Sequence, residues 1–413
     1  LTFGDGEETK LIIISAGNIR DESDWENYPN SNHTASVENP AQSWNALTIG
    51  AYTKKIKVND PRYSAYTPLA KEGELSPYST TSLMWEKKWP VKPDVVFEGG
   101  NLLKAPDDTI TSHEDLDLLS TSKTFNLKPF ETINATSAAT AQASWFAAKI
   151  AYEYPNARPE TIRGLIVHSA NWDNAMINQM NIKQSNRGDY KKLLKVFGYG
   201  IPDLDKAIYS HESAFTFIAE EIIQPFELIN SNGTTKDIQI YDLPWPSELL
   251  SSMGDNDVIL RITLSYFIQP GAGEIGWKDK YRYQSHGLRF DINNSTEDLT
   301  VFKQRINKAV RDDDYEHNSN NSSGKWKIGI DNRNSGSIHS DIWEGTAAEL
   351  ATSHYIAVFP VIGWWRERKQ LGKVDHKAHY SLIVSLETQA QEVPLYTTVR
   401  NMIEIPVEIP IIP

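Results

Sequence analysis

The chain has 413 residues, of which 54 are acidic and 41 are basic, so its formal net charge is −13. This acidic balance repels polyanions, and we expect no binding of nucleic acid. No cysteine is present, which excludes disulfides, cysteine-ligated zinc and a thiol nucleophile. The length favours two or three domains, and 12 Trp, 18 Tyr and 13 Phe indicate folded cores.

The ends and the apolar runs of the chain bear on its location. The longest apolar stretch, residues 355–365, is about half of the roughly 20 residues that a spanning helix needs, and Pro360 and Gly363 interrupt it. We therefore expect no membrane association. Residues 1–15 lack the pattern of a signal peptide, and the first residue is Leu1, which predicts removed sequence upstream. The lack of cysteine makes a cytoplasmic location the simpler expectation.

Residues 1–210 alternate short apolar runs with helical stretches. The runs at 11–15, 46–52 and 93–97 are typical of buried strands in a parallel sheet. Residues 137–154 are rich in alanine and are followed by a second predicted helix at 158–169. The polar, acidic stretch 101–131 is predicted to be a surface insertion. This half of the chain is thus expected to be an α/β domain.

Residues 211–413 instead show repeated short β-type runs separated by Gly, Asn and Pro. These runs lie at 238–241, 258–267, 287–292, 355–361 and 380–386. The pattern predicts an antiparallel β-sandwich with a helix near 297–311 and a flexible polar link at 312–323. We therefore expect two domains, 1–210 and 211–413.

The first chemical motif is SAGN, residues 15–18, directly after an apolar run. A strand that ends in small residues can present the Asn18 amide at the carboxyl edge of a parallel sheet, where it could stabilise a developing oxyanion. The alternative is an ordinary turn in which Asn18 adopts a left-handed conformation.

The second motif is NATSAATAQAS, residues 134–144. A serine in the first turn of a helix lies beside free backbone N–H groups and the positive end of the helix dipole, which favour a nucleophile. The alternative is that Thr136 or Ser137 only caps an alanine-rich core helix.

Together these motifs resemble the subtilase family of serine peptidases. The resemblance is supported by seven segments in family order over about half the chain. They are SAGN at 15–18, NPAQSWNALTIGAYT at 39–53, LSPYS at 75–79, KPDVVFEGG at 92–100, Thr136 with Ser137, PNARPETIRGLIVHSA at 155–170 and GYGIPDLDKAI at 198–208. The resemblance implies a subtilisin-like parallel sheet with flanking helices, its N-terminal part missing, followed by the sandwich.

The resemblance also implies roles for individual residues. Ser137 would attack the scissile carbonyl of a protein or peptide substrate, and Asn18 with the Ser137 backbone N–H would bind the oxyanion. The residues expected to line the substrate site are Ser15, Ala16, Gly17 and Thr136. Ala135 departs from the family, which usually has glycine there.

A larger departure concerns the catalytic Asp and His, because no segment like D-(S/T)-G or H-G-T precedes Asn18. The family order is Asp, His, Ser, so both are expected N-terminal to residue 1, and this chain alone should be nearly inert. The alternative is a non-catalytic subtilase-like scaffold that serves as a protein-interaction module.

The histidines suggest no other chemistry. None of His33, His113 and His168 lies in an H-G-T-like context, and His168 falls on a predicted helix, where packing is the expected role. His376 and His379 could supply only two ligands, and no further ligand motif lies near them in the sequence, so we expect no zinc site there. We predict no metal and no cofactor.

The second half contains runs rich in Trp, His and Gly, at 282–291, 336–351 and 356–369. They resemble an intracellular bacterial subtilase group whose genes lie beside an AAA-type ATPase in anti-phage operons. This resemblance implies an ATPase partner and a docking role for the sandwich. The alternative is that Trp343, Trp364 and Trp365 are core aromatics.

Overall fold

A computed structural model describes residue 3 and residues 9–86, 89–183, 186–208, 214–243, 246–271, 282–311 and 325–388. The chain divides into two compact units. The α/β unit comprises Leu11–Ala157 and Leu165–Ile208, and the sandwich unit comprises Leu1–Lys10, Arg158–Gly164 and Tyr209–Pro413. The chain thus passes from one unit to the other close to residue 210, but residues 1–10 and 158–164 group with the second half.

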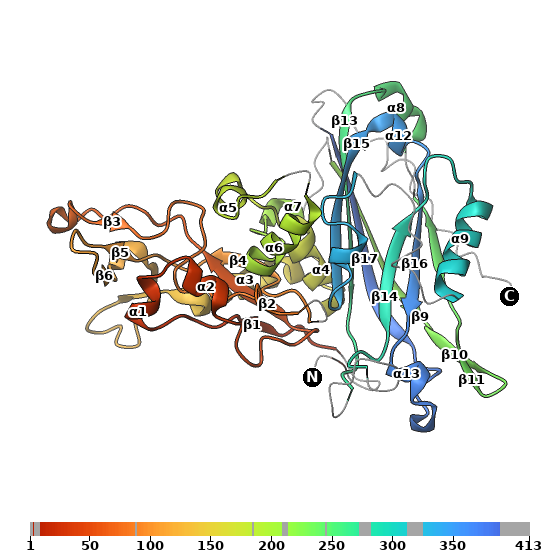
Figure 1. The fold of residues 1–413 in the computed structure, drawn as a ribbon, viewed down its shortest axis with the longest axis horizontal. Helices are drawn as coiled ribbons and strands as arrows, with labels where there is room; N and C mark the ends of the chain where they lie inside the picture. The colour runs from red at the N-terminus through yellow and green to blue at the C-terminus, as the bar shows by residue number, and fades with distance from the viewer. Residues whose placement is uncertain are drawn as a thin grey trace. The chain divides into compact units, whose positions relative to one another are not determined.

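The α/β unit is built on a parallel sheet of order β1-β2-β4 (Figure 1). Its strands are β1 (Ile13–Ser15), β2 (Leu47–Tyr52) and β4 (Val95–Glu98). Ile13 pairs with Leu47, and Ile49 pairs with Val95. Every residue of β2 is buried, as expected of a strand between two neighbours under helices. The three strand predictions of the first half are confirmed.

Short elements complete this unit. The helices are α1 (Glu22–Trp25), α2 (Asn30–Thr34), α3 (Ala135–Glu153), α4 (Pro159–Ser169), α5 (Asn174–Gln179), α6 (Arg187–Phe197) and α7 (Leu204–Ile208), with 3-10 turns η1 (Pro61–Tyr63) and η2 (Glu114–Leu116). The first residues of α4 belong to the sandwich unit. The small antiparallel strands are β3 (Thr67–Pro68), β5 (Leu103–Lys104), β6 (Ile110–Thr111), β7 (Leu118–Thr121) and β8 (Phe130–Ile133).

Helix α3 packs against all three parallel strands. Its alanines make this possible, because Ala138, Ala139 and Ala143 are buried and let the helix approach the sheet closely. The helix therefore carries its first turn to the carboxyl edge of the strands, where the Ala135 N–H donates to the Gly99 carbonyl.

Two predicted motifs meet at β4. The buried Lys92 ammonium donates to Asp94 at 2.6 Å and to the Ala46 carbonyl at 2.8 Å, and Asp94 accepts the Thr48 N–H at 2.7 Å. Gly198, at φ +57°, lies so close that a Cβ there would stand 2.2 Å from the Asp94 carbonyl oxygen. Only glycine fits this position, so the G-x-G segment at 198–200 packs directly against Asp94, the residue before β4.

The prediction that residues 101–131 form a surface insertion is wrong for its first part. Leu102, Leu103 and Leu116 are buried, because the short strands β5 and β6 fold this stretch back onto the unit. The hairpin of β7 and β8 does lie at the surface, where Leu119 and Phe130 are exposed.

Among its described residues the sandwich unit contains two larger antiparallel sheets, of order β15-β13-β17-β9 and β12-β16-β14, and the two-stranded sheet β10-β11 (Figure 1). The strands are β9 (Ala214–Ile223), β10 (Phe226–Ile229), β11 (Asn232–Thr235), β12 (Gln239–Asp242), β13 (Asp257–Tyr266), β14 (Gly287–Ile292), β15 (Ile338–Thr346), β16 (Tyr355–Val361) and β17 (Ala378–Thr388). The helices are α8 (Ser247–Met253), α9 (Leu299–Arg311), α11 (Ile330–Arg333), α12 (Ala347–Leu350) and α13 (Trp364–Glu367), with η5 (Lys369–Leu371).

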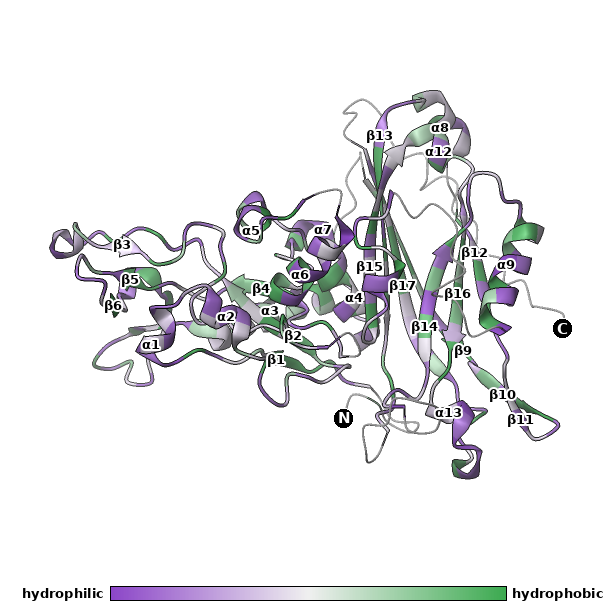
Figure 2. Cartoon of the chain, viewed as in Figure 1, coloured by the Kyte–Doolittle hydropathy of each residue, from purple (hydrophilic) through white to green (hydrophobic). Residues whose placement is uncertain are grey.

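The five predicted strands correspond to β12, β13, β14, β16 and β17, and the predicted helix corresponds to α9, so these elements are confirmed. The strands β9, β10, β11 and β15 were not predicted. The apolar face of α9 packs Phe302 and Ile306 on Ala357 and Phe359 of β16, and hydrophobic and hydrophilic residues alternate along the helix (Figure 2). The predicted polar link at 312–323 lies outside the described residues. No helix in the parts of the chain that the structure describes is long and apolar enough to span a membrane.

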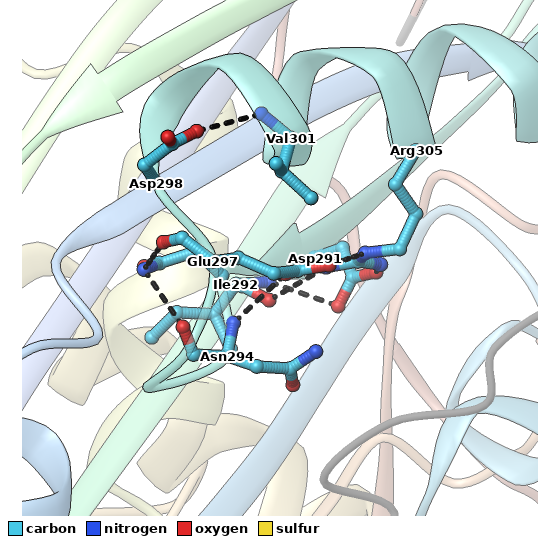
Figure 3. A network of polar contacts seen from close by, with 8 residues as sticks. Asp291, Ile292, Asn294, Glu297, Asp298, Val301 and Arg305 are labelled. Atoms are coloured by element: carbon cyan, nitrogen blue, oxygen red, sulfur yellow. Dashed lines mark hydrogen bonds and ion pairs between the residues drawn. The ribbon is translucent and has the colours of Figure 1, made fainter.

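A clamp of charges fixes the start of α9 (Figure 3). The Arg305 guanidinium donates to Asp291 at 2.5 Å and to both oxygens of Glu297, at 2.7 and 3.0 Å.

Trp343, Trp364 and Trp365 are all buried, which confirms their interpretation as core aromatics.

Candidate active site

Asn18 is presented by the turn that ends β1. The Ala16 N–H still donates to the Ile49 carbonyl at 2.9 Å, and Gly17 then takes φ +111°. A Cβ on Gly17 would stand 2.6 Å from Cγ of Glu38, so glycine is required. Asn18 itself has no positive φ and forms an antiparallel bridge with Ser79. The interpretation of SAGN as a left-handed asparagine turn is therefore wrong.

Ser137 lies in the first turn of α3, which begins at Ala135 with Asn134 as its N-cap residue. The Ser137 side chain is exposed, whereas its neighbours Thr136 and Ala138 are buried. Neither Thr136 nor Ser137 is the N-cap, so the interpretation of these residues as helix caps is wrong. An exposed hydroxyl at the positive end of a 19-residue helix is favoured as a nucleophile.

Three hydrogen bonds join the two motifs, although 118 positions separate Asn18 from Thr136. Oδ1 of Asn18 accepts from the Thr136 N–H at 2.9 Å and from its Oγ1 at 2.6 Å. Thr136 Oγ1 also lies 3.1 Å from the Gly17 carbonyl. A backbone N–H can only donate, so these bonds fix the amide with Oδ1 toward Thr136. The Asn18 Nδ2 group has no hydrogen-bond partner among the described residues, so it remains available as a donor on a side chain that is bonded to Thr136, the residue before Ser137.

Ala135 takes φ +65°, in the left-handed region. For a residue with a Cβ this conformation costs about 1–2 kcal/mol, which explains why glycine is usual there in the family. The Ala135 N–H donates to the Gly99 carbonyl at 2.7 Å and holds the turn in place. The substitution is thus accommodated at some cost in stability.

Two residues that the sequence analysis did not single out support this turn. The Asn134 Nδ2 group donates to Asp117 Oδ1 at 3.0 Å and to Tyr78 Oη at 3.3 Å. Burial raises the pKa of the Asp117 carboxyl above its usual range, and hydrogen bonds from Asn134 and Thr132 oppose that rise. Tyr78 lies in the LSPYS segment, but no local pattern relates Asp117 or Tyr78 to Asn134, because they lie 17 and 56 positions from it.

The other predicted site residues lie behind these groups. Ser15 pairs with Ile49 inside the sheet, and Ala16, Gly17 and Thr136 are buried. The Ala16 carbonyl accepts from Glu38 N–H and Thr80 Oγ1. Substrate contact by these four residues remains a prediction, and the burial of three of them favours a supporting role.

Histidines do not complete the site among the residues described here. Ser137 has no hydrogen bond to a histidine in this set, and Nδ1 of His113 accepts the Asp115 N–H at 3.1 Å instead. His168 is buried on α4, as predicted. No group of three or more metal-ligating His, Cys, Asp or Glu side chains occurs within the described ranges.

Comparison with known proteins agrees with the motif order. Residues 1–200 match the model of the subtilase family of peptidases. A curated relative, the uncharacterized protein y4bN of Sinorhizobium fredii (strain NBRC 101917 / NGR234), is 22% identical over 413 residues, covering 96% of this chain and 88% of its own length.

Solved structures give weaker likenesses. MycP1 from Mycobacterium smegmatis is 16% identical with a TM-score of 0.26, over 49% of this chain and 42% of that protein. Fervidolysin from Fervidobacterium pennivorans, described as a keratinolytic enzyme related to subtilisin, is 15% identical with a TM-score of 0.25, over 56% and 27%. The chain thus spans less than half the length of either, and likenesses this low do not bear on its activity.

The match to the subtilase family model covers residues 1–200, and Asn18, Thr136 and Ser137 all lie inside it. In the α/β unit the hydrogen bonds of Thr136 to Asn18 bring the two motifs together, and the catalytic roles of Asn18 and Ser137 stay predictions. The first 200 residues of the chain, slightly less than half of its length, are thus similar to the subtilase family.

Proposed function

We propose that the chain is part of a serine endopeptidase that cleaves protein substrates through an acyl-enzyme. The observation that carries this proposal is the orientation of the Asn18 amide, whose oxygen is held by both donors of Thr136 at 2.9 and 2.6 Å. Its nitrogen is left as a hydrogen-bond donor beside the exposed Ser137 hydroxyl. A donor and a nucleophile at one helix start are what acyl transfer requires.

In this mechanism Ser137 Oγ attacks the carbonyl carbon of the scissile peptide bond, and a general base takes the hydroxyl proton. The negative charge moves to the carbonyl oxygen, which the Asn18 Nδ2 group and the Ser137 backbone N–H bind. The intermediate collapses, the C–N bond breaks, and the protonated base gives its proton to the leaving amine. Water then attacks the acyl-enzyme by the same route and releases Ser137.

We propose that the base is a histidine, oriented by an aspartate, and that both lie N-terminal to residue 1 in the full-length protein. The family order of Asp, His and Ser supports this, as does the lack of a histidine partner for Ser137 among the described residues. A serine without a base is a poor nucleophile, so the activity belongs to the full-length protein.

The test is active-site labelling of the full-length protein with a fluorophosphonate, with Ser137→Ala as the variant. We expect labelling of the wild type and none of Ser137→Ala, because the probe phosphonylates only an activated serine. An exposed serine on the same helix, Ser144, provides a matched control, and Ser144→Ala should label as the wild type does. Equal labelling of wild type and Ser137→Ala would favour the non-catalytic scaffold.

The cytoplasmic location, the AAA-type ATPase partner and the role against phage follow from the resemblance of the second half, and we propose them on that basis alone. In this proposal the sandwich unit docks the ATPase. Co-purification of the full-length protein with the ATPase of the neighbouring gene would test the pairing, and its failure with both proteins folded would contradict it.

A further inference from the structure

Asn134 occupies the N-cap position of α3, but its side chain does not cap the helix. An asparagine there ordinarily accepts a hydrogen bond from the backbone N–H of the second or third helical residue, here Thr136 or Ser137. Thr136 N–H donates to Asn18 instead, at 2.9 Å. The Ser137 N–H has no hydrogen-bond partner among the described residues. The helix thus begins with an open backbone donor beside the exposed Ser137 hydroxyl.

The Asn134 amide is held elsewhere by two side chains. Its Nδ2 donates to Asp117 Oδ1 at 3.0 Å and to Tyr78 Oη at 3.3 Å. A carboxylate is an acceptor only, so Asp117 selects the nitrogen of the amide. Asp117 is itself fixed, because its N–H donates to the Glu114 carbonyl at 3.2 Å.

Tyr78 connects this contact to the other half of the site. The Tyr78 side chain is buried and packs edge-on against Trp25. Its carbonyl accepts the Ile19 N–H at 2.9 Å, directly after Asn18. The residue that orients the start of α3 is therefore bonded to the segment that presents Asn18.

We propose that Asp117 and Tyr78 are positioning residues that hold the Asn134 amide away from the start of α3 and so keep the Ser137 N–H free to bind the oxyanion. This inference rests on the proposed function, since the free donor has a use only if Ser137 is acylated. It predicts an unusual pair of effects. Without Asp117 the amide turns to cap Ser137, so the helix gains a hydrogen bond while the reaction loses a donor.

The test is Asp117→Ala in the full-length protein, measured by peptide hydrolysis and thermal unfolding. We expect kcat to fall by about ten- to a hundredfold, within the effect of losing one oxyanion donor, with KM nearly unchanged. The unfolding temperature should stay the same or rise. The double variant Asp117→Ala with Asn134→Ala should recover most of kcat, because alanine cannot cap the helix.

Two matched variants separate this role from a structural one. Asp117→Asn keeps an acceptor for Asn134 and should remain close to wild type, and Glu114→Ala, an exposed acid on the same turn, should have no effect on kcat. A loss of kcat that Asn134→Ala fails to recover would overturn the proposal, as would a fall in unfolding temperature that accounts for the lost activity.

Hydrogen exchange at the Ser137 amide gives a readout that does not depend on activity. We expect slower exchange in Asp117→Ala than in the wild type or the double variant, since only the single variant acquires a cap at this amide. Unchanged exchange in Asp117→Ala would overturn the inference even in an active enzyme. A wild type that hydrolyses nothing but shows the exchange pattern would contradict the proposed function and leave the positioning contact supported.

Discussion

Around Asn18 and Ser137 the α/β unit leaves hydrogen-bond donors open near its surface, whereas the sandwich unit binds its buried cations within itself. The Arg163 guanidinium donates to the Tyr266 and Ser337 carbonyls, both at 2.7 Å. Arg333 donates to Asp341 at 3.2 Å and to the Phe290 carbonyl at 3.0 Å. Buried ion pairs serve the architecture in both units, since Lys92 and Asp94 form one in the α/β unit. The α/β unit in addition keeps donors open around Asn18 and Ser137, and on this difference we base the proposal that the chemistry belongs to that unit.

The largest effect is expected from a substitution that removes one partner of the buried Arg333–Asp341 ion pair in the sandwich unit. Asp341→Ala leaves the Arg333 charge without its buried anion, so we expect the free energy of unfolding to fall by about 3–5 kcal/mol. Denaturant unfolding followed by tryptophan fluorescence measures it. The labelling rate of Ser137 in the folded full-length protein should not change, and a parallel loss of labelling would contradict the separation of roles.

The matched control is Glu344→Ala. Glu344 lies on β15, as Asp341 does, but it is exposed and pairs with Lys327 at the surface. Surface pairs contribute about 0–1 kcal/mol, so its unfolding should stay close to that of the wild type.

In the α/β unit the sharpest substitution is Asn18→Asp. The aspartate keeps an acceptor for both donors of Thr136 but replaces the Nδ2 donor with an anion. We expect kcat of the full-length protein to fall by about 10²–10³, equivalent to about 2.7–4 kcal/mol, with little change in KM or unfolding temperature. The exposed Asn27→Asp controls for the added charge. Wild-type kcat in Asn18→Asp would exclude the oxyanion role.

Acid should affect the sandwich through His286. Burial lowers the pKa of this histidine from 6.5 to about 3, and its ring stacks on Trp365 at 4.8 Å between centroids. Below pH 6.5 the histidine is protonated in the unfolded chain but stays neutral in the folded chain. The free energy of unfolding is therefore highest above pH 6.5 and decreases as the pH falls toward 3. At pH 5 the loss is about 2 kcal/mol.

His286→Gln should flatten this pH dependence, as measured by denaturant unfolding between pH 7 and pH 4. An unchanged slope in the variant would show that His286 is not the group responsible.

The smallest expected effect concerns Ala135. Ala135→Gly relieves the left-handed strain but adds freedom to the unfolded chain, so we expect a gain of up to about 1 kcal/mol. Ala138→Gly, inside the same helix, should instead lose about 1 kcal/mol or more. Thermal unfolding distinguishes the two signs, and destabilisation by Ala135→Gly would mean that the alanine is not strained.

Local patterns predicted most of the fold because each element is encoded over a few neighbouring residues. The buried strand β2 and the alanine-rich helix α3 are examples. The stretch 101–131 was misjudged because its short strands and the 3-10 turn η2 carry isolated apolar residues, such as Leu103 and Leu116, in a polar and acidic context. A two-residue strand is stabilised by what lies across from it, and sequence composition does not show that partner.

Some features of the candidate site were likewise predictable from the sequence, and others were not. The order of the motifs predicted that Asn18 and Ser137 belong to one site, and the bonds through Thr136 are consistent with it. The left-handed Ala135 and the Asn134 contacts to Asp117 and Tyr78 were not predictable, since they depend on side chains brought together by tertiary structure. In an ordinary helix the N-cap side chain bonds to the first turn, whereas here Asn134 makes no capping bond and Ala135 has a positive φ.

The central claim is that the Asn18 amide and the Ser137 hydroxyl act on the same carbonyl group. A crystal structure of the full-length protein inactivated by a peptidyl phosphonate tests it most directly. The account predicts phosphorus bonded to Ser137 Oγ, with a phosphonyl oxygen about 3 Å from both the Asn18 Nδ2 and the Ser137 backbone nitrogen. An adduct on another residue, or a phosphonyl oxygen that Asn18 does not reach, would contradict it.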